Sequence, residues 1–425
     1  MTAPTPPRTE LLREKNFRWM MSGAAISSLG DQFTLIALPW LVLAMTGDPL
    51  TLGLVIAAMS VPRAIFILVG GALVDRYSPK SVLMLSKFAN GALLAVLAGM
   101  VLCNQVSMPA VYVLAVALGL ASAFSIPSGT SMLPHVVAPH LLPMANGIMM
   151  GMRQLTMLCG PLLAALVFAL FGDGTGGAPD AGRGIGLALA FDCLSFFVSA
   201  WTLHHVQLQH GGAKAAPQAV LRAIGEGLAA VWKDLSLRVC IVYWALGSFI
   251  VGGTMQVALP VLADTRLEGA ASLGLLMGMH GAGSLAGMGL TGVFGKLRIG
   301  TFGATLLSVD AIVGALLIGL GWVSNGSQGA ALMLLIGVLG GFVQVAVFSW
   351  IQQRVPRAML GRAMSIFMFI FMGLAPMAAA ITGALLKYVS LTSLFAGAGG
   401  FLLVAAGVAW LFTPMASVTD APAIG

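Results

Sequence analysis

Continuous apolar runs recur along the whole chain, and they constrain its fold more than any other feature. Each run is close to the roughly 20 residues that an α-helix needs to cross a bilayer. Only 8% of the 425 residues are charged, too few to cover a water-soluble protein of this length. Barrel strands would alternate polar and apolar residues over about ten positions, and these runs do not. Because lipid leaves helices as the remaining way to pair every backbone group, the sequence predicts an all-α membrane protein.

Twelve transmembrane helices are predicted, with both chain ends on one side of the membrane. Their ranges are 17–45, 52–74, 82–103, 109–132, 142–171, 184–206, 239–262, 272–294, 301–322, 329–350, 361–387 and 392–412. The predicted domains are an N-terminal tail (1–16), a six-helix half (17–206), a linker with an amphipathic helix (207–238), a second six-helix half (239–412) and a C-terminal tail (413–425).

Basic residues gather on one face of this arrangement. Sixteen of the 21 Lys and Arg residues fall in the tail, the linker and the loops on the side of the two termini. This count places Lys87 with the loop between the second and third spans. Since cytoplasmic loops carry the excess of Lys and Arg, we expect a multi-pass protein of the inner (plasma) membrane with both termini cytoplasmic. The net charge of +7 then reflects orientation and contact with membrane lipid, not binding of nucleic acid.

The two halves of the chain repeat one another. Ala37-Leu38-Pro39 recurs as Ala258-Leu259-Pro260, and Leu52-Gly53-Leu54 recurs as Leu273-Gly274-Leu275, both at an offset of 221 residues. Parallel repeats of this kind are a known transporter architecture, with the substrate site between the repeats near the bilayer midplane. The repeat therefore predicts two pseudo-symmetric six-helix halves.

The segment after the second span reads GALVDRYSPK, residues 71–80. It resembles the signature of the major facilitator superfamily between helices two and three, and the resemblance covers the whole chain. It implies the major facilitator fold and transport by alternating access. Asp75 can accept hydrogen bonds at the start of a neighbouring helix, which would latch the cytoplasmic side closed; the alternative is a loop that only anchors topology. The candidate gating residues are Gly71, Asp75, Arg76 and Lys80.

Within the superfamily the chain is most similar to the drug and siderophore exporter branch, which includes macrolide and enterobactin exporters. The similar stretches are Gly30-Asp31-Gln32-Phe33, Asn146, Gly160-Pro161, and Phe191-Asp192 with Ser195-Phe196. This resemblance implies proton-coupled export of an amphipathic small molecule. The alternatives are an importer or flippase of an amphipathic metabolite or lysolipid, and a non-transporting membrane receptor.

Charged residues inside apolar spans cost about 3 kcal/mol each to insert, so each needs a partner or a function. Asp31, in the first span, can carry a proton or meet a cationic substrate, with Arg63 as its counter-ion. Arg153 can bind an anion or assist coupling. The alternatives are a structural ion pair or a helix-packing hydrogen bond for Asp31, a purely structural role for Arg63, and pairing with a neighbouring carbonyl for Arg153. For Asp192 and Asp310 we expect a structural role. The candidate substrate-binding or coupling residues are Asp31, Gln32, Arg63, Arg153, Gln154, Gln256, His280 and Gln344.

Enzyme and ATPase motifs are absent from the sequence, which contains no G-x-S-x-G, no H-E-x-x-H and no Walker loop. The four cysteines fall in or beside apolar spans, where we expect small packing residues and not a disulfide or metal site. Gly287-x-Gly289-x-x-Gly292 and Gly147-x-x-x-Gly151 lie within spans and predict close helix packing. We therefore expect no enzymatic activity, no cofactor and no metal. The expected partners are a small-molecule substrate, protons and membrane lipid, and we expect the chain to act as a monomer.

Overall fold

The computed structural model covers the whole chain and describes residues 7–76, 78–172, 182–208, 232–267, 269–294, 298–355 and 374–419. Throughout these residues the secondary structure is helical, with no strand. Eleven described helices are long and apolar enough to cross a membrane, and a shorter apolar helix covers Pro376–Leu385. The predicted all-α membrane fold is confirmed. The eleventh predicted span, 361–387, is described from residue 374 onward, and most of the amphipathic helix predicted in 207–238 lies outside the described residues.

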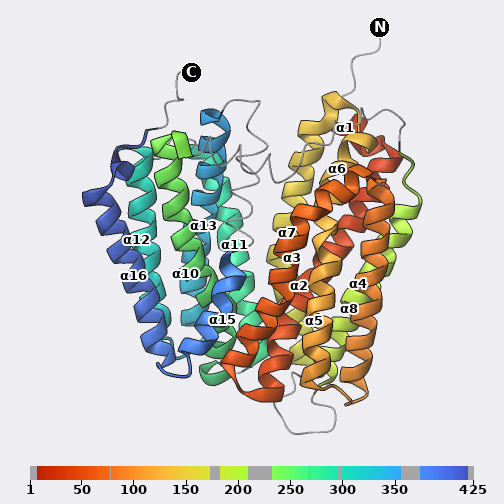
Figure 1. Ribbon diagram of the computed structural model, residues 1–425, viewed down its shortest axis with the longest axis horizontal. Coiled ribbons are helices and arrows are strands. Elements are labelled where there is room, and N and C mark those ends of the chain that lie inside the picture. Colours follow the sequence, from red (N-terminus) through yellow and green to blue (C-terminus); the bar gives the residue numbers. More distant parts are fainter. Residues whose placement is uncertain are drawn as a thin grey trace. The chain divides into compact units, whose positions relative to one another are not determined.

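The chain forms two compact units, which are coloured along the sequence in Figure 1. Unit 1 comprises Met1–Met45 and Ala58–Pro217, and unit 2 comprises Thr46–Ala57 and Gln218–Gly425, so that α3 begins in unit 2. The helices that begin in the first half of the chain are α1 (Pro7–Arg13), α2 (Lys15–Thr46), α3 (Pro49–Arg76), α4 (Pro79–Leu102), α5 (Met108–Ala123), α6 (Ser125–Val136), α7 (Leu142–Phe171) and α8 (Arg183–His204). Those of the second half are α10 (Leu235–Arg266), α11 (Ala270–Phe294), α12 (Phe302–Leu320), α13 (Gly326–Arg354), α15 (Ala375–Leu385) and α16 (Leu391–Phe412).

Polar residues fix where several helices of unit 2 begin. The side chains of Thr301, Asn325 and Ser390 accept hydrogen bonds from the backbone N–H groups of the first turns of α12, α13 and α16, at 3.0, 2.9 and 3.1 Å. Each cap satisfies a backbone donor that has no partner within its own helix. These caps explain why the three helices begin within a few residues of the starts of the predicted apolar spans.

The sequence repeat corresponds to matching positions in matching helices. Both α2 and α10 are 32 residues long, and each contains an internal proline, Pro39 and Pro260. In the helices that follow, Leu52 and Leu273 are buried at 0% and 1% exposure. The repeated residues therefore serve the same packing positions in the two halves.

Glycines allow α11 and α13 to approach closely. A Cβ atom at Gly287 would overlap the carbonyl oxygen of Val338, and one at Gly337 would overlap that of His280. The predicted packing role is confirmed for Gly287. No close approach is seen at Gly289, Gly147 or Gly151, where a Cβ would meet no described atom within 4 Å. A small-xxx-small pattern shows that close approach is allowed, but not that a neighbouring helix is there.

Asp234 ties the start of α10 to the end of α13. Its carboxylate accepts hydrogen bonds from the backbone N–H groups of Ser236 (2.9 Å) and Leu237 (3.2 Å) and from Nε of Arg354 (2.8 Å). Burial alone would raise the pKa of Asp234, but the hydrogen bonds and the Arg354 charge outweigh it and hold the pKa below its ordinary value. The ionised carboxylate therefore stabilises unit 2 at neutral pH, and this contribution is lost as the pH falls through the lowered pKa.

The residues after α16 pack back onto unit 2 instead of extending away as a free tail. Met415 is fully buried, and the backbone N–H of Gly303 donates to the carbonyl of Val418 at 3.0 Å. The indole N–H of Trp350 donates to the carbonyl of Thr419, also at 3.0 Å. The described part of the predicted tail thus covers the adjoining ends of α12 and α13.

Membrane orientation is tested by two positions that flank α4. Ser78 immediately precedes this helix, Gln105 follows it, and both side chains are exposed. The predicted orientation places Ser78 in the cytoplasm and Gln105 outside. In a variant with the four native cysteines replaced by alanine, Gln105→Cys should react with an impermeant maleimide in intact spheroplasts, and Ser78→Cys only after lysis. The opposite labelling pattern would show that the orientation is inverted.

Candidate functional site

Charged side chains on five helices of unit 1 gather around Asp31 of α2. Its carboxylate interacts electrostatically with Lys87 of α4, Arg63 of α3 and Arg153 of α7, and the interaction with Lys87 is the largest of the three. Lys87 also interacts with Asp192 of α8. These five residues, here named the Asp31 cluster, bring three cations and two carboxylates together within membrane-spanning helices.

Asp192 is the buried carboxylate of the Asp31 cluster. It is 1% exposed and accepts hydrogen bonds from the hydroxyls of Thr34 on α2 and Ser195 on its own helix. Gly30 makes this arrangement possible, because a Cβ there would overlap the carboxylate and the Ser195 hydroxyl. The sequence predicts only a structural role for Asp192, and the structure joins this residue both to α2 and to Lys87.

Lys87 lies between the helices that carry the two carboxylates. Its ammonium donates to the Ser27 hydroxyl of α2 at 2.7 Å and lies 4.8 Å from the centre of the Phe196 ring of α8. The prediction that groups Lys87 with the basic residues of a cytoplasmic loop is therefore wrong. The residue lies well inside α4, and its side chain faces α2 and α8.

Asp31 has the more exposed side chain of the two carboxylates in the cluster. The next residue, Gln32, is half-buried and lies against Gly160 of α7, where a Cβ would overlap the Gln32 side chain. This close approach brings α7 against α2. The Gly160-Pro161 pair singled out in the sequence thus positions α7 beside Asp31.

The remaining candidates of unit 1 present polar groups of different kinds. Arg153 of α7 is exposed and Arg63 of α3 is half-buried. The Gln154 side chain is buried, and its Oε1 accepts no hydrogen bond from the described residues. An unsatisfied buried acceptor of this kind can take a hydrogen bond from water or from a bound ligand.

The candidates in unit 2 are separate side chains on different helices. Gln256 of α10, His280 of α11 and Gln344 of α13 are all half-buried. The His280 ring makes a hydrogen bond with the backbone of Met333 on α13, while its Nδ1 has no partner among the described residues. Asp310 of α12 lies beside the Tyr243 hydroxyl of α10. The described contacts of unit 2 do not join these groups into a second charged cluster.

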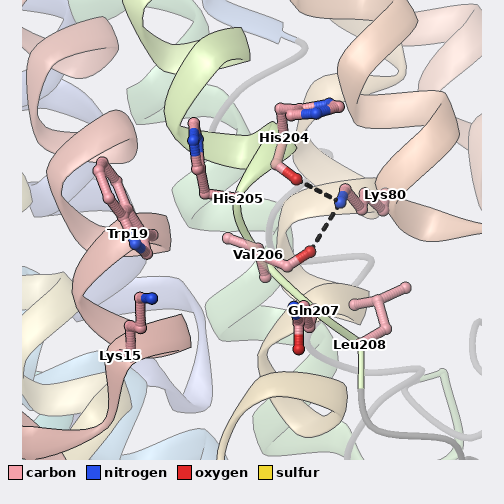
Figure 2. Close-up of a pocket in the computed structure, with 8 residues that line it drawn as sticks. All are labelled: Lys15, Trp19, Lys80, His204, His205, Val206, Gln207 and Leu208. Atoms are coloured by element: carbon pink, nitrogen blue, oxygen red, sulfur yellow. Dashed lines mark hydrogen bonds between the residues drawn. The ribbon is translucent and has the colours of Figure 1, made fainter.

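Of the four predicted gating residues, Lys80 is the one whose side chain is described. Gly71, Asp75 and Arg76 end α3, and their side chains lie outside the described residues. Lys80 donates to the carbonyl oxygens of His204 (2.9 Å) and Val206 (2.7 Å), as Figure 2 shows. It therefore fastens the start of α4 to the end of α8, and the latch itself stays a prediction.

Compensated charges inside membrane-spanning helices are typical of transport proteins, in which they mark substrate and proton pathways. The fold and the Asp31 cluster therefore define a polytopic membrane transport protein. The family model of the Major Facilitator Superfamily matches residues 20–380. The chain thus belongs to the major facilitator superfamily of secondary transporters, and it is not an enzyme.

The chain is similar to two curated relatives and to two solved structures. The uncharacterized MFS-type transporter y4rN of Sinorhizobium fredii is 26% identical over 404 residues, which cover 93% of this chain and 94% of that protein. The multidrug efflux pump Tap of Mycolicibacterium fortuitum is 30% identical over 228 residues, 52% of this chain and 53% of the pump. A mutant of the nucleoside transporter NupG superposes with a TM-score of 0.70 at 13% identity, covering 92% of this chain and 98% of that one. A bacterial homologue of the iron transporter ferroportin in an inward-facing state also gives 0.70, at 18% identity and with 93% and 98% covered. The two structures establish the shared fold alone, and the match to Tap spans about half of the pump.

Proposed function

We propose that this transporter exports an amphipathic small molecule, such as a drug or a siderophore, in exchange for protons. The observation that carries the proposal is the Asp31 cluster, in which an exposed carboxylate within a membrane helix stands beside three cations and a second, buried carboxylate. The similarity to the multidrug efflux pump Tap over half of the chain supports export as the direction.

Proton uptake by Asp31 changes the charge balance of the cluster. With both carboxylates ionised, three cations face two anions, which leaves one positive charge in excess. Protonation of either carboxylate doubles that excess. The two protonation states therefore favour different arrangements of α2, α4 and α8, and such a difference can couple a proton gradient to a conformational change.

Amide and guanidinium groups among apolar side chains suit a substrate with both polar and apolar parts. In this proposal Asp31 exchanges protons and the substrate contacts polar residues of unit 1. These contact residues are Gln32, Arg63, Arg153 and Gln154. The chain acts as a monomer, with both termini in the cytoplasm.

The proposal is tested with the purified full-length protein in liposomes that have an acidic interior. The probes are ethidium, a macrolide and a catecholate siderophore. We expect at least one of them to accumulate inside, to release protons from the interior as it enters, and to stop accumulating when nigericin removes the pH gradient. Accumulation only when the outside is the acidic side would indicate proton-coupled import. Saturable binding without flux of any probe would indicate a receptor.

A further inference from the structure

A pocket of about 620 Å³ lies at the end of unit 1 where α2 begins and α8 ends (Figure 2). Its lining includes Lys15, Trp19, Lys80, His204 and His205, and none of the described lining residues is Asp or Glu. The side chains of Lys15, His204 and His205 are exposed, so the pocket opens to the surface. Its volume lies within the roughly 300–1,000 Å³ range of small-molecule sites.

The backbone that forms the floor of this pocket is fixed by several contacts. Lys80 donates to the carbonyl oxygens of His204 (2.9 Å) and Val206 (2.7 Å), which hold the chain just after α8. The N–H of Gln207 donates to the side-chain oxygen of Asn16 on α2 at 3.0 Å. Val206 itself is fully buried in the apolar core of this end of the unit. The pocket is therefore built before any ligand arrives.

Aromatic rings mark the depth of the pocket in the membrane. Trp19 stacks on His205, with ring centres 4.8 Å apart, and meets Trp201 edge to face at 5.3 Å. Trp201 lies close to the end of α8 and is 57% exposed. Exposed tryptophans near the ends of membrane helices are typical of the level of the lipid headgroups. The basic pocket thus lies where a headgroup can reach it.

No acidic side chain among the described lining residues balances the positive charges of Lys15 and Lys80. Lys80 has three N–H donors and uses two of them on carbonyl oxygens, which leaves one for a ligand. Lys15 is exposed at the first turn of α2. Glu10 interacts with His140 at 3.2 Å, and neither Glu10 nor Glu14, the acid that precedes Lys15, is part of the lining. Lysine ammonium groups bind phosphate as point charges.

We propose that this pocket binds a phosphate-bearing anion, and that an anionic phospholipid supplies it. Lys15 and Lys80 provide the charge, the two histidines provide further donors, and Trp19 packs against the glycerol part of the lipid. In the predicted orientation the pocket opens at the cytoplasmic leaflet, whose anionic lipids attract basic residues. The pocket joins α2, α4 and α8, the helices that carry Asp31, Lys87 and Asp192, so an occupied pocket stabilises one arrangement of these helices.

The test uses the full-length protein in detergent, titrated with dihexanoyl phosphatidylglycerol or dihexanoyl phosphatidylcholine and followed by tryptophan fluorescence and thermal unfolding. We expect phosphatidylglycerol to bind more tightly and to raise the melting temperature more than phosphatidylcholine does. Lys15→Gln should weaken phosphatidylglycerol binding about fivefold, the factor that corresponds to about 1 kcal/mol per basic residue, and Lys15→Arg should keep most of it. The matched control is Arg18→Gln, which removes one exposed positive charge from the same helix outside the pocket lining and should leave binding unchanged.

Three results would overturn this proposal. Equal binding of the two lipids would exclude recognition of the anionic headgroup. A stabilisation by inorganic phosphate or glycerol 1-phosphate equal to that by phosphatidylglycerol would identify a soluble phosphate compound, not lipid, as the source. An equal loss of binding in Arg18→Gln and Lys15→Gln would show general attraction to a basic surface in place of a defined site. None of these results depends on transport activity, so the lipid site and the proposed export function are tested separately.

Discussion

Replacing Asp31 by Asn is expected to reduce proton-driven accumulation of substrate to the level of protein-free liposomes, while the protein still folds. Asn keeps the shape and hydrogen-bonding capacity of the side chain, but it cannot exchange a proton. Asp192 still interacts with Lys87 in this variant, so the Lys87 ammonium is not left without a carboxylate. Exchange of substrate down its own gradient is expected to survive, since that process needs no titrating group.

Gradient-driven uptake and downhill exchange are measured on the same proteoliposomes. The matched control is Asp310→Asn, which removes a carboxylate from a membrane helix of unit 2 outside the Asp31 cluster and should retain uphill transport. Full uphill transport by Asp31→Asn would show that coupling lies elsewhere. Arg153 and His280 would then be the next positions to replace.

The helices could be predicted from the sequence because their signal is local. A span must be apolar over about 20 residues, and that requirement can be checked without knowing its neighbours. The predicted span 142–171 coincides with α7, and 392–412 differs from α16 by one residue at its start. The α10 helix extends further than its predicted span 239–262, because Asp234 caps it at Leu235 and its last turn continues to Arg266. A polar cap and a charged last turn add helix that apolar content does not reveal.

The candidate site could be predicted only where a charge was conspicuous. Asp31, Arg63 and Arg153 were identified because each interrupts a long apolar run, where an unpaired charge is costly. Lys87 lies closer to the start of its helix, and a long basic side chain there can reach the membrane surface. Its direction toward α2 and α8 depends on which helices surround α4. The contact between Thr34 and Asp192 joins residues 158 positions apart, a pairing that the sequence alone does not encode locally.

Lys87→Met is expected to destabilise unit 1 strongly, because it leaves the buried Asp192 carboxylate without its cation. Lys87 interacts with both Asp31 and Asp192, and leaving a buried charge uncompensated costs on the order of 3–5 kcal/mol, whereas replacing both charged residues can be nearly neutral. Asp192, at 1% exposure, would keep only the Thr34 and Ser195 hydroxyls as partners. We expect the melting temperature of the purified protein to fall by on the order of 10 °C. The double variant Lys87→Met with Asp192→Asn should recover most of that loss.

The matched control for this cycle is Lys387→Met. Lys387 is 45% exposed and lies 3.7 Å from Asp48, and an exposed pair of this kind contributes about 0–1 kcal/mol. If Lys87→Met destabilises no more than this control, Lys87 does not compensate Asp192.

The pH dependence of the melting temperature gives an independent check, because a protonated Asp192 needs no counter-charge. The penalty of Lys87→Met should therefore shrink as the pH falls, and it should not do so in the double variant. A transport assay on the double variant separates a structural role of Lys87 and Asp192 from a functional one. If the double variant is stable but cannot accumulate substrate, the two residues are required for coupling as well as for folding.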